Sequence, residues 1–520
     1  MRRLALASLA AVTGCNWIYG LDATRALDAA PPAEVLPPAP RTKLVWAIAT
    51  TDGTPAPPML DPVLVYEPIG SEVLHPALPT VQVGDETGLM DAPYDPADGS
   101  FEIPYGLRES PHRILYTLPG ESIAHEVQWS VTGATITVPR TTRHDAPAAP
   151  GNAGYRITPV GLIGPLISPA LFTSGVFTYT NNASEFEQNG SVIRYRYAMY
   201  AHPLTAPGGA PEKSQGDWVL LGEFGSRGDG QSSLVGYALT QIELAGNTMG
   251  QPDSEPMWIS GLASERTIST GACPGVNCLP QPNKGQVNGR LDAALGSLGG
   301  TASEELAYGV SPSTELPGFL PGVAPGYLPR PLMLPFLVTD GLDATLKLTD
   351  PSDLLGLERV VYASARRSRM IDNVTLTSAI QAVTNKFSGS IEYLAPLVIS
   401  MKLGATSLSA ADTDGAPIPG SSSLQKLTFQ TEAGYTADDF VVTLYELAGV
   451  APSRTLVPVR IYHVLGPEVK IDGTLLVAGH EYVFGITARS GYGAADRGDY
   501  TKAQYPFGVS TTFGRTFVIQ

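Results

Sequence analysis

Cys273 and Cys278 are the residues of this chain best suited to covalent or metal chemistry. They stand in the segment GACPGVNCLP (271–280), where Pro274 and Gly275 supply a turn that brings the two side chains together. A redox pair has two intervening residues, whereas this pair has four, and no His or further Cys lies nearby to complete a zinc site. An isolated pair of cysteines in an exported protein is typical of a structural disulfide. We therefore predict a Cys273–Cys278 disulfide in preference to a redox or metal pair.

Two His-Glu pairs, His125–Glu126 and His480–Glu481, begin like the helical zinc motif of metalloproteases. That motif needs a second His four residues after the first, so that two imidazoles share one helix face. Trp129 and Phe484 stand at those positions, and both pairs lie in strand-like sequence. We expect ordinary surface residues beside a strand and predict no catalytic residue here.

Acidic residues alternate in Asp412-Thr413-Asp414-Gly415, as they do in calcium-binding loops. An EF-hand loop needs further ligands and a bidentate Glu at its twelfth position, which the residues after Ala416 do not supply. The sequence also has no Gly-x-Ser-x-Gly elbow and no Gly-Lys phosphate loop. We therefore expect a turn at Gly415 and predict neither a metal site nor a cofactor.

The composition favours a β-rich chain of several domains. The 520 residues are 43% hydrophobic, which allows packed cores, and the length exceeds that of one ordinary core. The 55 Gly and 46 Pro residues are spread along the chain, as in proteins whose short strands are joined by many turns. The net charge of −16 argues against nucleic acid and against electrostatic adhesion to anionic lipid.

The N-terminus carries the pattern of an export signal. Arg2 and Arg3 precede a short apolar run that ends in small residues before Cys15. The segment Val12-Thr13-Gly14-Cys15 resembles the lipobox of bacterial lipoproteins. That resemblance implies that residues 1–14 are removed as a signal peptide and that Cys15 is lipidated, which anchors the protein to a membrane.

Candidate strands and linkers divide the remaining chain into four regions. Residues 15–42, rich in Ala and Pro, are predicted to be an extended tether. Short strand-like runs predict an N-terminal β-sandwich at 43–147 and a middle β-rich region of one or two domains at 148–393. The last domain is 394–520. The fold class is all-β, a multidomain array of β-sandwiches.

Helical signals are weak throughout the chain. No segment shows a sustained periodicity of 3.6 residues. Residues 376–387 fit one short helix, but the run Val374–Thr377 fits a strand equally well.

The last domain resembles fibronectin type III domains. Leu476, Gly479 and Tyr482 match the tyrosine corner of that family, with Ala478 where the family usually has Pro. Phe440–Glu446 fits strand C, Leu427–Gln430 fits strand B, Val483–Ala488 fits strand F and Thr511–Ile519 fits strand G, although strand B offers Phe429 where the family has Trp. The resemblance implies an immunoglobulin-like sandwich.

The integrin-binding tripeptide Arg-Gly-Asp occurs at 227–229 and again as Arg497-Gly498-Asp499. The second copy falls in the predicted F–G loop, where the adhesive domain of fibronectin presents it. Asp and Gly are also the ordinary residues of turns in β-proteins, and we expect turn chemistry first, with an adhesive loop as the alternative.

These features predict a lipid-anchored protein of the cell envelope, at the outer membrane, with a non-catalytic binding, adhesion or structural role. Its partners would be the membrane, through the N-terminal lipid, and a protein or glycan at the cell surface. The alternative is an envelope hydrolase acting on glycan or peptide, with its active site in the middle region and a fibronectin-type accessory domain. Exposed Trp218 or Trp258 would favour glycan binding, and a cleft of converging carboxylates in 150–390 would favour the hydrolase.

Overall fold

The structure is a computed structural model that describes part of the chain. It covers most of residues 73–139, short strands and one helix between residues 153 and 350, and residues 358–386 and 390–520 except Ala411, together with strands at 41–47, 50–51 and 65–69. The chain forms two units, 1–40 and 41–520, and all described residues belong to the second.

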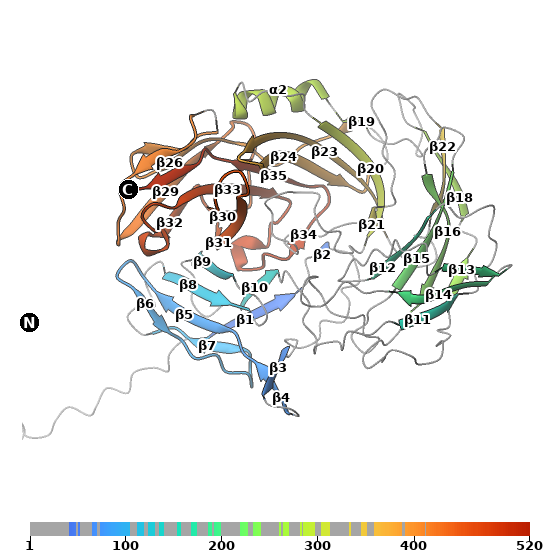
Figure 1. Ribbon diagram of the computed structural model, residues 1–520, viewed down its shortest axis with the longest axis horizontal. Helices are drawn as coiled ribbons and strands as arrows, with labels where there is room; N and C mark the ends of the chain where they lie inside the picture. Colours follow the sequence, from blue (N-terminus) through green and yellow to red (C-terminus); the bar gives the residue numbers. More distant parts are fainter. Residues whose placement is uncertain are drawn as a thin grey trace, which may run out of the picture. The chain divides into compact units, whose positions relative to one another are not determined.

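Strands dominate the described chain, which confirms the all-β fold class (Figure 1). The one α-helix among the described residues is α2 (Lys284–Leu295). No helix in the described part of the chain is long and apolar enough to cross a membrane. Residues 374–384 form a strand, β24, which settles the choice between helix and strand at that position.

The C-terminal residues form a two-layer immunoglobulin-like sandwich, as the sequence predicts. One layer has the order β27-β26-β29-β32, and the other contains β31-β30-β33-β35. The strands of the two layers are β26 (Val398–Leu403), β27 (Thr406–Ser407), β29 (Leu424–Thr431), β32 (Glu468–Asp472), β30 (Asp439–Ala448), β31 (Thr455–Val464), β33 (Glu481–Ser490) and β35 (Phe507–Phe513). The predicted strands B, C and F correspond to β29, β30 and β33. Strand G is divided between β35 and β36 (Phe517–Ile519).

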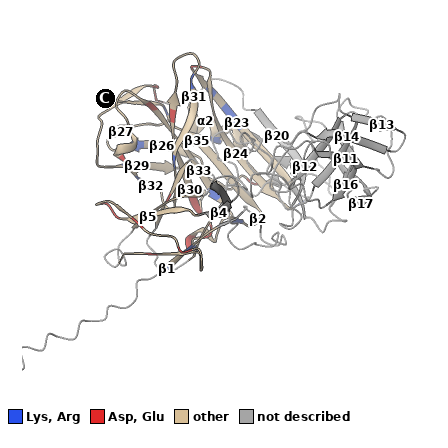
Figure 2. Ribbon diagram, turned by 60° about the horizontal axis from the view of Figure 1, so that its bottom comes forward, with Lys and Arg blue, Asp and Glu red and all other residues tan. Residues whose placement is uncertain are grey.

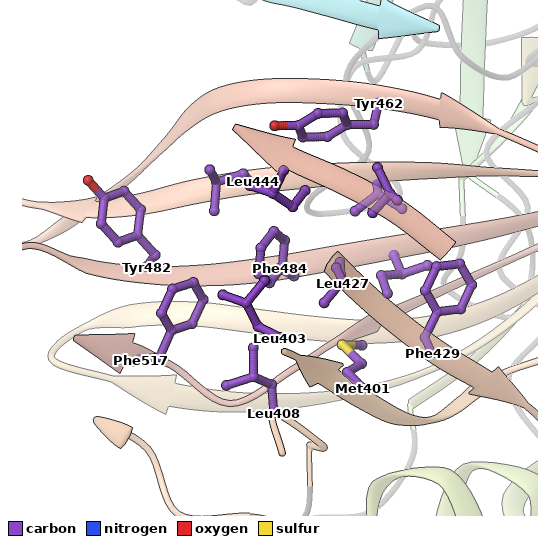
Figure 3. Packing of buried hydrophobic residues seen from close by; sticks show 14 of the residues in the cluster. Met401, Leu403, Leu408, Leu427, Phe429, Leu444, Tyr462, Tyr482, Phe484 and Phe517 are labelled. Atoms are coloured by element: carbon purple, nitrogen blue, oxygen red, sulfur yellow. The ribbon is translucent and has the colours of Figure 1, made fainter. Parts of the chain in front are cut away.

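The core of this sandwich lies between the two layers (Figure 3). Alternate residues of each strand point into it, because successive side chains of a strand face opposite sides of the sheet. Leu403 and Leu427 from one layer meet Leu444 and Phe484 from the other, and all four are buried. Phe429, the residue that replaces the family's Trp, packs edge-on against another buried ring, with centroids 4.9 Å apart.

Tyr482 makes the predicted tyrosine corner. Its hydroxyl accepts a hydrogen bond from the backbone N–H of Val477 (2.9 Å) and donates to the carbonyl of Leu475 (3.2 Å). Gly479, at φ +80°, adopts the left-handed conformation that the turn before β33 requires. The corner thereby fixes the loop between β32 and β33 to the start of β33.

The layer β31-β30-β33-β35 continues beyond both of its edges and is part of a single 14-stranded sheet. On one side β35 pairs with β24 (Val374–Thr384), which is followed by β23 (Glu358–Ile371), β20 (Ser303–Ser311) and β21 (Leu332–Met333). On the other side β31 pairs in parallel with β9 (Ala124–Trp129), which is followed by β8 (His112–Thr117), β5 (Thr80–Gly84) and β6 (Leu89–Asp91). The sheet therefore contains strands from all three predicted β regions.

A second small sheet completes the N-terminal sandwich. It has the order β10-β1-β7, in which β1 (Arg41–Ala47) pairs in parallel with β10 (Thr135–Pro139) and antiparallel with β7 (Ser100–Glu102). Leu44 and Phe101 from this sheet pack with Ile114 and Val127 from β8 and β9. Tyr500, from the C-terminal sandwich, belongs to the same core.

β28 (Ala416–Ile418) pairs in parallel with β36 within the long sheet, and smaller sheets account for the other described strands. They have the orders β11-β14-β13, β12-β15-β16-β17, β18-β22, β19-β25, β2-β34 and β3-β4. Their strands are β2 (Thr50–Thr51), β3 (Val65–Ile69), β4 (Val73–Ala77), β11 (Ala153–Ile157), β12 (Ser168–Thr173), β13 (Phe186–Asn189), β14 (Val192–Ala198), β15 (Val219–Ser226), β16 (Ser232–Thr240), β17 (Ile259–Gly261), β18 (Ser264–Ser269), β19 (Gln281–Pro282), β22 (Thr345–Asp350), β25 (Ser390–Ile391) and β34 (Lys502–Ala503). The predicted strand at 191–200 is found as β14.

Replacing Tyr482 by Phe tests the corner. The change leaves one backbone donor and one acceptor without their partner, so we expect the free energy of unfolding to fall by about 1–2 kcal/mol in urea titrations. Tyr500→Phe is the matched control, because the hydroxyl of Tyr500 is also buried but has no hydrogen-bond partner among the described residues. Equal losses in the two variants would contradict the role of the corner.

Candidate functional site

Strands β9 and β31 pair where the N-terminal and C-terminal sandwiches meet, and we call this contact the joint. Buried charged side chains from both sandwiches meet there. Glu126 on β9 is fully buried and accepts hydrogen bonds from Arg113 on β8, at 2.6 Å from Nε and 3.0 Å from Nη2. Nη1 of Arg460, on β31, lies 3.4 Å from Oε2 of the same carboxylate, the oxygen that also accepts from Nη2 of Arg113. A carboxylate removed from water needs charged partners of this kind, and here they come from the two neighbouring strands.

Gln128, on the same face of β9 as Glu126, closes the edge of the opposite layer. Its side-chain amide donates to the carbonyl of Lys470 on β32 (2.7 Å) and accepts from the N–H of the same residue (3.0 Å). It also donates to Glu126 (2.8 Å). A side chain therefore takes the place of a neighbouring strand along an edge that would otherwise present unpaired backbone groups.

Four buried rings form a column on the other face of the joint. Tyr116 stacks on His125 with centroids 5.2 Å apart, and His125 stacks on His463 at 5.9 Å. Tyr500 lies 5.2 Å beyond His463. Burial, with contributions from His125 and Arg489, lowers the pKa of His463 well below its ordinary value, so this imidazole is neutral at pH 7.

A second buried ion pair stands beside this column. Arg489 on β33 and Asp439 on β30 are both inaccessible to solvent, with Nε 2.8 Å from Oδ1. Arg489 also donates to the carbonyl of Tyr500 (3.0 Å) and lies over the ring of Tyr492, 4.3 Å from its centroid. Burial raises the pKa of both phenols, which therefore stay neutral.

The expectation that His125 and Glu126 are surface residues is wrong. Both are buried, because β9 is an inner strand of the long sheet, and they point to opposite faces of it. His480 is partly exposed and lies 2.9 Å from Glu446, and Glu481 is paired with Arg454. No cluster of three or more His, Cys, Asp or Glu residues that could hold a metal occurs in the described part of the chain.

The two carboxylates of the calcium-like segment bond to the protein itself. Asp412 accepts from the hydroxyl of Ser407 (2.7 Å) and the N–H of Ser409 (3.1 Å). Asp414 binds Arg369 on β23 through both oxygens, at 2.8 and 2.7 Å. Gly415 has φ +77°, as the expected turn requires.

The tripeptide Arg497-Gly498-Asp499 lies against β10. The carbonyl of Gly498 accepts from the N–H of Thr137 (2.8 Å), and the carboxylate of Asp499 accepts from the backbone and hydroxyl of Thr501 (3.0 and 2.6 Å). The side chain of Arg497 is 76% exposed. The segment has the turn chemistry that the sequence predicts, and its adhesive role stays a prediction.

Several predicted residues lie outside the described residues. They are Cys15, Cys273, Cys278, the Arg-Gly-Asp copy at 227–229, and the tryptophans Trp218 and Trp258. The joint, in turn, was not predicted from the sequence.

Comparison with known proteins identifies no family for this chain. No protein-family model matches the sequence, and no curated protein matches it. A solved structure of Sidekick-1 immunoglobulin domains 1–5 aligns over 94% of this chain and 78% of its own, with a TM-score of 0.12 and 9% identity. A structure of Sidekick-1 immunoglobulin domains 1–4 aligns over 95% of this chain and 99% of its own, with a TM-score of 0.11 and 8% identity.

Replacing Glu126 by Gln tests the joint. The variant leaves Arg113 and Arg460 buried without a counter-charge, so we expect a loss of about 3–5 kcal/mol in the free energy of unfolding. Glu102→Gln is the matched control, because Glu102 pairs with Arg41 at the surface, and its loss should stay below about 0.5 kcal/mol. A loss below about 0.5 kcal/mol in both variants would show that the Glu126 network is dispensable.

Proposed function

We propose that this chain is a lipid-anchored protein of the bacterial cell envelope with a non-catalytic role in binding, adhesion or structure. The location rests on the sequence from Met1 to Cys15, with its basic start, short apolar run and lipobox-like end. Several acyl chains on Cys15, as the lipoprotein resemblance implies, hold a protein to a membrane far more durably than one chain.

One structural observation supports a non-catalytic role. The buried charged side chains at the joint and beside it form pairs that tie strands together: Glu126 on β9 with Arg113 on β8, and Asp439 on β30 with Arg489 on β33. General acids, bases and nucleophiles have to reach a substrate, whereas these groups are enclosed between packed layers. Their arrangement is that of a support for the sheet.

The long sheet suits a role in presenting surfaces. It links the N-terminal and C-terminal sandwiches through backbone hydrogen bonds between β9 and β31. Loops at the ends of sandwiches are the usual place for ligand contacts, because the sheets hold them rigidly. Both acidic and basic residues occur on the described strands (Figure 2). We therefore favour a protein or glycan partner bound by shape and hydrogen bonding.

Cys15→Ala tests the anchor. Without the thiol no lipid can be attached, and we expect the protein to move from the membrane fraction to the soluble fraction after alkaline washing of the cells' membranes. Mass spectrometry of the N-terminal peptide of the unaltered protein should show acyl chains on Cys15. An unmodified Cys15, or a variant that stays with the membrane, would contradict the proposal.

The partner is tested with the soluble chain from residue 16 onward. Glycan arrays and cross-linking to intact cells should show saturable binding, and the bound glycan or protein should remain chemically unaltered. Turnover of an envelope glycan or peptide by the purified protein would instead support an envelope hydrolase with its active site in the middle region.

A further inference from the structure

Strand β6 (Leu89–Asp91) ends the long sheet on the side of the N-terminal sandwich (Figure 1). Its inner side pairs antiparallel with β5, and its outer side pairs with no other described strand. The backbone N–H and C=O groups along such an edge can pair with a strand of another chain.

The hydrogen-bond pattern shows which backbone groups of β6 face outward. In an antiparallel ladder, pairs that exchange hydrogen bonds alternate with pairs that do not. The N–H of Ala92 donates to the carbonyl of Val81 (2.9 Å), so this pair is of the first kind. The next pair along the ladder, that of Asp91, is therefore of the second kind, and so is that of Leu89. Both residues direct their backbone groups away from β5, and no other described residue bonds to those groups.

Met90 supplies an apolar contact at the same edge. It pairs with Val83, so the two side chains point to the same face of the sheet. Val83 is fully buried in the core of the N-terminal sandwich, whereas Met90 is 51% exposed because it belongs to the last strand. A strand added beyond β6 would cover Met90 and continue that core.

The surface around β6 is acidic. Residues 80–107 contain six Asp and Glu residues and no Lys or Arg. The basic partners of these carboxylates come from elsewhere in the chain: Lys470 pairs with Glu86, and Arg41 is shared by Asp95, Asp98 and Glu102. The described surface beside this edge therefore keeps an excess of negative charge, which attracts a basic strand and repels a second copy of β6.

We propose that β6 is a docking edge for an extended, basic segment of a protein partner, which joins the long sheet as a further strand. Its backbone pairs with Leu89 and Asp91, an apolar side chain covers Met90, and basic side chains meet the acidic surface. Because β6 is short, the charges contribute much of the attraction, and binding depends on salt. The inference rests on the proposed binding role and names the class of partner for one surface.

A peptide in which lysine alternates with valine is the probe for this edge. Fluorescence titration of the full-length protein in non-ionic detergent should show saturable binding that weakens as salt is added. The amides of Leu89 and Asp91 should exchange hydrogen more slowly in the complex. A peptide with glutamate in place of lysine should not bind, and neither should a lysine peptide with methylated backbone nitrogens. Binding of the glutamate peptide, or unchanged exchange in β6 at saturation, would overturn the proposal.

Leu89→Pro and Asp91→Lys separate the edge from a general effect of charge. Proline at position 89 removes one outward N–H and keeps the pairing with β5, and lysine at position 91 reverses a charge on the edge, so each should weaken binding of the lysine peptide about tenfold. Asp496→Lys is the matched control, because the side chain of Asp496 is 73% exposed at another surface. Equal losses in Asp91→Lys and Asp496→Lys, or full binding by Leu89→Pro, would contradict docking at β6.

The remaining outcomes distinguish this inference from the proposed function. Dimerisation that depends on protein concentration and protects β6 would show that a second copy covers the edge, which overturns the proposal. Binding to cells without peptide docking would overturn the docking edge and leave the binding role supported. Peptide docking without binding to cells would support the edge and contradict the proposed role at the cell surface.

Discussion

The parallel pairing of β9 with β31 is the contact on which the rest of the described structure depends. An isolated immunoglobulin-like sandwich would expose the outer edge of β31, with its row of unpaired backbone groups. Here that edge receives residues 124–127 of the N-terminal sandwich over residues 460–463. The pairing turns two sandwiches into parts of one sheet, and it brings Glu126, His125 and Gln128 to the places where they act.

Because side chains alternate along a strand, the shared sheet has two buried faces at the joint. On one face, Glu126 and Tyr462 point toward the layer that contains β32. On the other, His125 and Val127 point toward the layer that contains β1. The two sandwiches thus have their second layers on opposite sides of the same sheet. Residues 494–503 reach the N-terminal side, where Tyr500 packs in the core with Leu44, Ile114 and Val127 of β1, β8 and β9.

The parts of the fold that could be predicted from the sequence are those set by local chemistry. Tyr482 and Gly479 identify a tyrosine corner because both the turn and the hydroxyl's partners lie within a few residues. The joint depends instead on residues more than 300 positions apart, such as Glu126 and Arg460. Polar residues alternate with His125 and Val127 along β9, a pattern that also fits a strand with one face in water.

Helix α2 was missed for a different reason. Its buried residues Val287, Leu291 and Ala294 follow helical spacing, which is the signal that could have revealed it. Gly285 and Gly289 lower the helical propensity of the same segment and weaken that signal. Contacts outside the helix supply what propensity lacks: Arg290 donates to the carbonyls of Tyr393 and Ala395, each at 2.6 Å, and pairs with Glu432. The helix is specified by its partners more than by its own residues.

Buried charges at the joint contribute specificity more than stability. An apolar β9 could pair with β31 in more than one register, and a slip of one residue would turn every side chain to the other face of the sheet. With the sequence as it is, a slip of β9 against β31 would turn Glu126 away from Arg460 and Gln128 away from β32, and it would separate His125 from His463. The cost of a buried charge that loses a partner exceeds the net gain from a well-formed buried pair. The network therefore acts mainly by making the alternative registers unfavourable, and that is how two sandwiches joined by a short parallel contact keep one arrangement.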